Sequence, residues 1–103
     1  MNESFIRSRI SELRLKKGVS EYRMSTDMGH SKSYIQSITS GRSLPSLTEF
    51  FYMCEYFGIS PHDFFNEELE NPALLQKAID GLKTLKDDDL TLILKNIQRL
   101  QEK

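Results

Sequence analysis

The chain has 103 residues, of which 38% are hydrophobic and 28% are charged, a composition typical of one small soluble domain with an extension. No run approaches the ~18 apolar residues of a membrane span, and the first residues lack the apolar core of a signal peptide. The single cysteine excludes an internal disulfide and fits a reducing, cytoplasmic environment. The net charge of −1 does not favour nucleic-acid binding, so any such role must depend on the local arrangement of charges.

Helical spacing with end signals recurs along the chain, and no strand pattern is present in the sequence. The first predicted helix runs from about Ser4 to Lys17, with Gly18 as its left-handed stop. The second begins at the N-cap Ser20 and ends before Gly29. The apolar side chains that should face inward from these two helices are Ile6, Ile10, Leu13, Met24 and Met28.

Three more helices are predicted in the first part of the chain. One spans 31–40, with Ser31 as its cap and Gly41 after its end. The next begins at Ser46, which is spaced to form a capping box with Glu49. The signals for the rest of that helix and for a short fifth one are Leu47, Phe50, Phe51, Cys54, Phe57, Gly58, Ser60, Pro61 and Asp63.

Residues 67–71 are acidic and predict a linker between a domain at 1–66 and a helical segment at 72–103. That segment holds two predicted helices, at 72–85 and 87–103, and the second starts with three aspartates at the positive end of the helix dipole. Its apolar stripe consists of Leu90, Ile93, Leu94, Ile97 and Leu100. The sequence therefore predicts an all-α protein: a five-helix domain followed by two C-terminal helices.

The spacing between the second and third helices is the most informative local feature. Two short helices joined by a glycine turn form the pattern of a helix-turn-helix unit. Gly29 can adopt the positive φ that such a turn requires. Ser25 places a small side chain where the two helices should cross. The pattern therefore predicts that the second helix supports the third.

The third predicted helix separates short polar side chains on one face from Ile35 and Ile38 on the other. The polar face consists of Lys32, Ser33, Gln36, Ser37 and Ser40. An ordinary solvated face would favour Glu and Lys, since serine is a poor helix former. Short hydroxyl side chains let a helix approach a DNA groove, and Gln and Lys can bind base edges. This face indicates contact with the major groove, and Arg42 indicates contact with a phosphate.

Short motifs over about residues 6–65 occur together in a characteristic order. They are Ile10-x-x-Leu13-Arg14, Lys17-Gly18-Val19-Ser20, Met28-Gly29, Ser31-x-Ser33-Tyr34-Ile35, Ile38-x-Ser40-Gly41-Arg42, Pro45-Ser46-Leu47 and Phe57-Gly58-Ile59-Ser60. On these motifs the chain resembles the Cro and phage repressor helix-turn-helix proteins, often called XRE-like. The resemblance implies a sequence-specific DNA-binding transcriptional repressor that binds a palindromic operator as a homodimer.

The resemblance also implies roles for individual side chains. The implied base-contacting residues are Lys32, Ser33, Gln36 and Ser37. The implied phosphate-contacting residues are Arg14, Ser31, Ser40, Arg42 and Ser43. Three positions depart from the family pattern: Glu21 stands where Gln is usual, Arg23 where Glu is common, and Thr39 where an acid is usual. The last change removes the usual partner of Arg14 and leaves this arginine freer to reach a phosphate.

The apolar stripe of the last helix requires a covering surface, because each buried Leu or Ile contributes about 1.5–3 kcal/mol. The helix at 72–85 can cover part of it, a second copy of the chain can cover more, and a two-fold DNA site requires that copy. We therefore expect a homodimer through 72–103. The alternatives are that the stripe folds back on the first domain or binds another protein, as in an antitoxin-like or adaptor protein.

The sequence contains no pattern that indicates an enzyme, a metal site or a cofactor. His30, His62 and Cys54 are scattered without metal-ligand spacing, and no glycine-rich phosphate loop is present. We expect His30 to stabilise the turn or to lie on the surface, and Cys54 to lie in the core.

Overall fold

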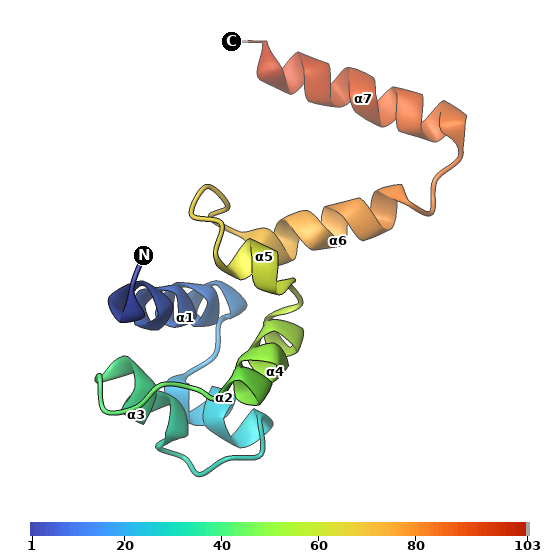
Figure 1. The fold of residues 1–103 in the computed structure, drawn as a ribbon. Helices are drawn as coiled ribbons and strands as arrows, with labels where there is room; N and C mark the ends of the chain where they lie inside the picture. Colours follow the sequence, from blue (N-terminus) through green and yellow to red (C-terminus); the bar gives the residue numbers. More distant parts are fainter. Residues whose placement is uncertain (103) are drawn as a thin grey trace. The chain divides into compact units, whose positions relative to one another are not determined.

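The computed structural model describes residues 1–102, which form seven α-helices and no strand (Figure 1). The helices are α1 (Glu3–Lys17), α2 (Glu21–Asp27), α3 (Tyr34–Thr39), α4 (Leu47–Phe57), α5 (Pro61–Phe64), α6 (Pro72–Leu82) and α7 (Asp87–Gln101). The all-α class and the order of elements predicted from the sequence are confirmed. The chain divides into two compact units, Met1–Ala73 and Leu74–Lys103.

Serine caps position the starts of three helices. The side-chain oxygens of Ser20, Ser46 and Ser60 each accept a hydrogen bond from the backbone N–H three residues later, at 2.9, 3.1 and 3.1 Å. α1 begins slightly earlier than expected because Asn2 caps it, accepting from the N–H of Phe5 at 3.3 Å. These bonds satisfy N–H groups that have no partner inside their own helix.

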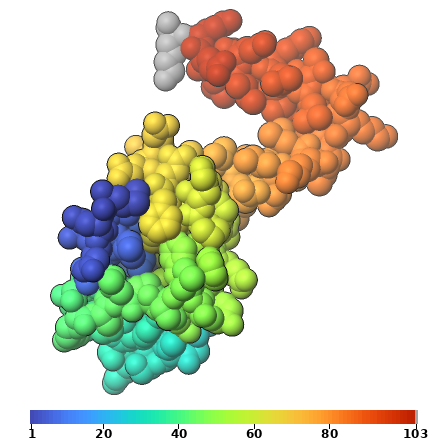
Figure 2. All heavy atoms as spheres, in the orientation of Figure 1, coloured from blue at the N-terminus to red at the C-terminus, as the bar shows by residue number. Residues whose placement is uncertain are grey.

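A single core of buried side chains holds the first unit together. Its members are Ile10, Leu13, Met24, Ile35, Ile38, Phe50, Met53, Cys54, Phe57, Ile59 and Phe64. Phe64 is fully buried and packs edge-on against Phe50, with the ring centroids 4.9 Å apart. Figure 2 shows the closed packing of this unit, with the blue atoms of α1 against the green and yellow segments. The core therefore fixes α3 relative to α1 and α4.

A buried arginine joins α1 to the end of α5. Arg9 is only 3% exposed. Its Nε donates to the carbonyl of Phe64 at 2.8 Å, and its Nη2 donates to the carbonyls of Asp63 and Asn66 at 2.9 and 3.2 Å. Its Nη1 pairs with the carboxylate of Glu12 at 2.6 Å. The carbonyls at a helix end lack partners inside the helix, so this guanidinium satisfies them. This contact was not predicted from the sequence.

The second unit begins inside α6. Pro72 is fully buried and Ala73 packs against the core of the first unit, whereas the sequence placed the division at 67–71. α6 ends at Leu82, three residues earlier than expected, and a turn leads to α7. Within Asp87–Gln101 no side chain is buried.

Candidate DNA-binding surface

The third helix starts later than the sequence suggested. It spans Tyr34–Thr39, and a turn precedes it in which the carbonyl of Ser31 accepts from the N–H of Tyr34 at 3.1 Å. The prediction that Ser31 caps this helix is wrong. The side-chain acceptor comes instead from α2, where Oγ of Ser25 accepts from the N–H of Ile35 at 3.0 Å.

Ser25 connects the two helices of the helix-turn-helix unit through both functions of its hydroxyl. The side chain is fully buried, as expected for a small residue at the crossing of α2 and α3. Besides accepting from α3, Oγ donates to the carbonyl of Glu21 at 2.8 Å. α2 and α3 accordingly lie together at the edge of the first unit that is remote from α5 (Figure 1). One buried hydroxyl therefore sets how α2 supports α3.

The polar face predicted around α3 is exposed except at Ser37. Lys32, Ser33 and Gln36 are exposed to solvent, while Ile35 and Ile38 have no exposed surface. The remaining exposed residues assigned to this surface are Ser31, Ser40, Arg42 and Ser43. The two isoleucines anchor α3 in the core and hold its polar side chains outward, which is the arrangement that groove contact requires.

Gln36 and Arg42 interact with each other. Nη2 of Arg42, in the loop after α3, donates a hydrogen bond to Oε1 of Gln36. Both side chains are exposed. The arginine expected at a phosphate is therefore also in contact with the amide expected at a base.

Ser37 differs from the other serines of this surface because it is partly buried. Its Oγ donates to the carbonyl of Tyr34 at 2.7 Å and lies 3.0 Å from Oγ of Ser43. A hydroxyl has one hydrogen, so Ser43 is the donor in that pair. Both hydroxyls thus help to shape the loop after α3, and they are less available to DNA than the exposed hydroxyl of Ser33.

Two arginines of α1 reach the helix-turn-helix unit. Nη1 of Arg14 donates to the carbonyl of Val19 at 2.8 Å, so this guanidinium is tied to the turn between α1 and α2. Nε of Arg7 donates to the carbonyl of Ile38 at 3.0 Å and stabilises the C-terminal end of α3. The role of Arg7 was not predicted, because its acceptor lies 31 positions away and the pattern of α1 contains no signal for it.

Two of the positions that depart from the family pattern are paired. Oγ1 of Thr39 donates to Oε2 of Glu21 at 2.5 Å, which joins the start of α2 to the end of α3. A hydrogen bond to a carboxylate is stronger than one between neutral groups. The residues at these two departing positions therefore contact each other and join α2 to α3.

The third departure, Arg23, forms an ion pair within α2. Its Nε lies 3.0 and 3.1 Å from the two carboxylate oxygens of Asp27. Tyr56 of α4 donates to the same carboxylate at 2.8 Å. This bond holds the pKa of Asp27 below its ordinary value, and burial raises the pKa of Tyr56 to about 12. The charge of Arg23 is therefore balanced within the fold.

His30 stabilises the turn between α2 and α3, as expected. Its ring stacks on that of Tyr34 with the centroids 3.8 Å apart. Its Nε2 lies 2.7 Å from Oε2 of Glu49, which joins the turn to α4. The carboxylate of Glu49, expected to complete a capping box with Ser46, is used in this contact. The contact between His30 and Glu49 therefore helps to fix the helix-turn-helix unit against α4.

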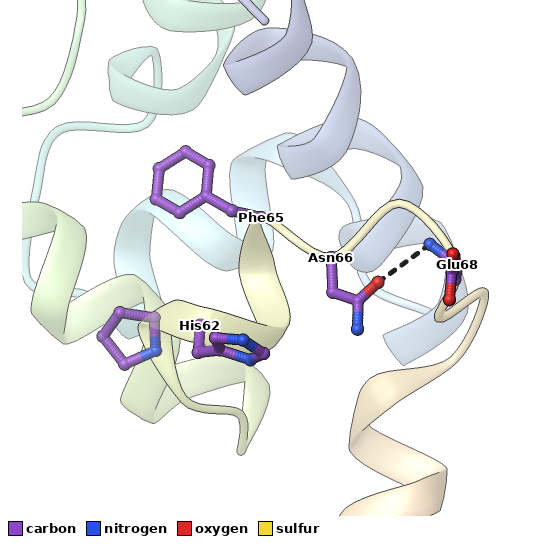
Figure 3. Close-up of a pocket in the computed structure, with 5 residues that line it drawn as sticks. His62, Phe65, Asn66 and Glu68 are labelled. Carbon is purple, nitrogen blue, oxygen red and sulfur yellow. Dashed lines mark hydrogen bonds between the residues drawn. The ribbon is translucent and has the colours of Figure 1, made fainter.

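A shallow hollow lies near α5. It is lined by Pro61, His62, Phe65, Asn66 and Glu68 (Figure 3). Oδ1 of Asn66 accepts from the backbone N–H of Glu68 at 3.0 Å, so this amide serves the local turn. Within residues 1–102 no three His, Cys, Asp or Glu side chains are grouped to hold a metal ion. Over the same range, no helix has the length and apolar character needed to span a membrane.

Comparison with known proteins identifies the family. A helix-turn-helix family profile matches residues 10–64, more than half of the chain, and covers all of α2 and α3. No curated protein and no solved structure matches the chain. The matched region contains the buried isoleucines, the glycine turn and the exposed polar face described above. The chain belongs to the helix-turn-helix family of DNA-binding regulators, of the Cro and phage repressor (XRE) type.

Proposed function

We propose that the protein is a sequence-specific transcriptional repressor that places α3 in the major groove of a palindromic operator. The observation that carries this proposal is that α3 buries Ile35 and Ile38 completely, while Gln36 of α3 and the polar residues that flank the helix are exposed, namely Lys32, Ser33, Ser40 and Arg42. Exposed serines and one glutamine at and beside a helix are an unusual choice for a merely solvated surface, where Glu and Lys are better helix formers. Short polar side chains of this kind suit close approach to base edges.

The proposed contacts fall into two groups. Lys32, Ser33, Gln36 and Ser37 contact base edges and set the sequence preference. Ser31, Ser40, Arg42, Ser43 and Arg14 contact phosphates and set the register on the duplex. The exposure of Lys32 and Ser33 in the turn before α3 supports the first group. Arg14 is half-buried, with its Nε buried and its Nη1 bound to Val19, so it contributes through its Nη2.

The repressor acts as a homodimer through 72–103, because two copies are needed to place α3 on both half-sites. The apolar stripe of α7 supports this assignment. Its exposed members, Leu94, Ile97 and Leu100, are 56%, 40% and 63% exposed. A second copy of the chain would remove these side chains from water, and each one buried contributes about 1.5–3 kcal/mol.

A salt series on promoter fragments tests DNA binding. If the positive charges of Lys32, Arg42 and Arg14 lie against the duplex in both copies and displace its counterions, log K should fall linearly with log salt concentration, with a slope of several units. Lys32→Ala should make the slope shallower, and the matched control Lys83→Ala, in the turn after α6, should leave it unchanged. The measurement is fluorescence anisotropy of labelled duplexes.

Absence of binding to any promoter fragment at low salt would contradict the proposal. It would favour the adaptor alternative, in which the exposed stripe of α7 binds a different protein. The net charge of −1 is the observation that favours this alternative, because DNA-binding proteins are commonly basic.

A further inference from the structure

The contact between Gln36 and Arg42 fixes the orientation of the Gln36 amide. Nη2 of Arg42 donates to Oε1 of Gln36. A guanidinium carries only donors, and the amide nitrogen of a glutamine also carries only donors. Only the amide oxygen can therefore face Arg42. The two N–H groups of Nε2 remain free of this contact.

Backbone bonds fix the loop that carries Arg42. The N–H groups of Arg42 and Ser43 both donate to the carbonyl of Ser37, at 3.0 and 3.1 Å. Gly41 has a φ of 91°, a conformation that favours glycine. The carbonyl of Gly41 accepts from Nη2 of Arg7 at 3.5 Å. The loop is thus bound to both α3 and α1, so the fold determines where the backbone of Arg42 lies and places its side chain within reach of Gln36.

We propose that Arg42 is a positioning residue that makes Gln36 selective for a keto base, guanine or thymine. This inference rests on the proposed function, in which Gln36 faces base edges in the major groove. There guanine presents the acceptors O6 and N7, and thymine presents O4. These acceptors match the N–H groups that Gln36 offers while Arg42 holds its oxygen.

The same contact disfavours the other two bases. Glutamine reads adenine by accepting from N6 and donating to N7 at once. With Oε1 of Gln36 engaged by Arg42, the first of these bonds is weakened. Cytosine presents an N4 donor, which likewise requires the amide oxygen. Gln36 held in this orientation therefore disfavours bases that present an amino group.

The pair matters mainly in the complex with DNA. Between exposed side chains such a contact contributes little to the stability of the free protein. A bound duplex excludes water from this surface, and hydrogen bonds are stronger in surroundings of low dielectric constant. Loss of the Arg42 side chain is thus expected to change base preference while leaving the fold intact.

The test measures the affinity of wild-type and variant proteins for a set of duplexes that differ at single positions. Gln36→Ala first identifies the base pair that Gln36 contacts, which is the position where the variant binds all four bases with similar affinity. At that position, Arg42→Ala should raise the affinity for adenine relative to guanine and thymine by at least about fivefold, the lower end of the discrimination by a good base contact.

Two controls distinguish positioning from a simple phosphate contact. In the Gln36→Ala background, Arg42→Ala should lower the affinity for all duplexes without changing their ranking. Lys32→Ala should leave the preference at the Gln36 position unchanged. If Arg42→Ala alone weakened binding equally for every base, the inference would be overturned and the repressor proposal would stand. Failure of the wild-type protein to bind any duplex would overturn both.

Discussion

The two units of the molecule differ in what covers their apolar side chains. In the first unit, Ile38 and Phe64 have no exposed surface and belong to one shared core. In the second, Leu94 and Leu100 are 56% and 63% exposed, and α7 has no buried side chain. The fold of the first unit is thus specified within one chain. The stripe on α7 is as apolar as a buried face, but a further surface is needed to cover it. We propose that a second copy of the chain provides this surface.

The largest expected effect comes from opening the core of the first unit. Phe64→Ala should lower the free energy of unfolding by about 3–5 kcal/mol, because it removes a fully buried aromatic ring and leaves a cavity. Chemical denaturation followed by circular dichroism measures this loss, which should not depend on protein concentration. A loss under about 1 kcal/mol would mean that the core is packed differently.

A charge on the stripe of α7 should change the oligomeric state and leave the stability of the first unit nearly unchanged. Leu94→Asp should shift the sedimentation mass to that of a monomer, because a carboxylate cannot be buried in an apolar interface without a large cost. The unfolding of the first unit should be nearly unchanged. Thr91→Asp, on α7 but outside the stripe, is the matched control and should leave the mass as it is. A mass unaffected by Leu94→Asp would rule out dimerisation through this stripe.

A smaller effect is expected at the crossing of α2 and α3. Ser25→Ala should cost about 1–3 kcal/mol of unfolding free energy, because the buried N–H of Ile35 loses its acceptor. It should also weaken DNA binding, since α3 would be held less firmly. Thr26→Ala changes an exposed neighbour on the same helix and provides the control. Equal stability of the two variants would show that the hydroxyl of Ser25 is dispensable.

The smallest change concerns the reactivity of the one thiol. Burial raises the pKa of Cys54 to about 11, and its side chain is 2% exposed. At pH 8 about 0.1% of the thiol is ionised, and the thiolate is the reactive form. Iodoacetamide should therefore modify Cys54 only after denaturant unfolds the protein. Rapid modification in native buffer would show that the first unit opens more readily than its core indicates.

Contacts between near neighbours in the sequence could be predicted, and contacts between distant residues could not. The caps at Ser20 and Ser60 follow from groups three positions apart, so local pattern is sufficient. The cap on α3 comes from Ser25, ten positions before its donor. The helix was consequently placed too early, with Ser31 as a cap that the structure does not use.

The same limit applies to the candidate site. The outward position of Gln36 could be predicted because helical periodicity places it away from Ile35 and Ile38. The bond between Glu21 and Thr39 could not, since each position was read alone as a departure from a family pattern. Side-chain pairs such as Gln36 with Arg42 depend on the course of a loop, which periodicity does not specify.

The most direct test of the account is selection of bound sequences from random double-stranded DNA by the purified protein. Wild-type protein should enrich a two-fold symmetric sequence. Lys32→Ala should enrich a sequence that differs at the base pair that Lys32 contacts in each half-site, because the variant loses about 1–3 kcal/mol of discrimination there. Enrichment of the same sequence by both proteins, or of none by either, would contradict the assignment of the exposed surface formed by α3 and the turn before it as the DNA-reading surface.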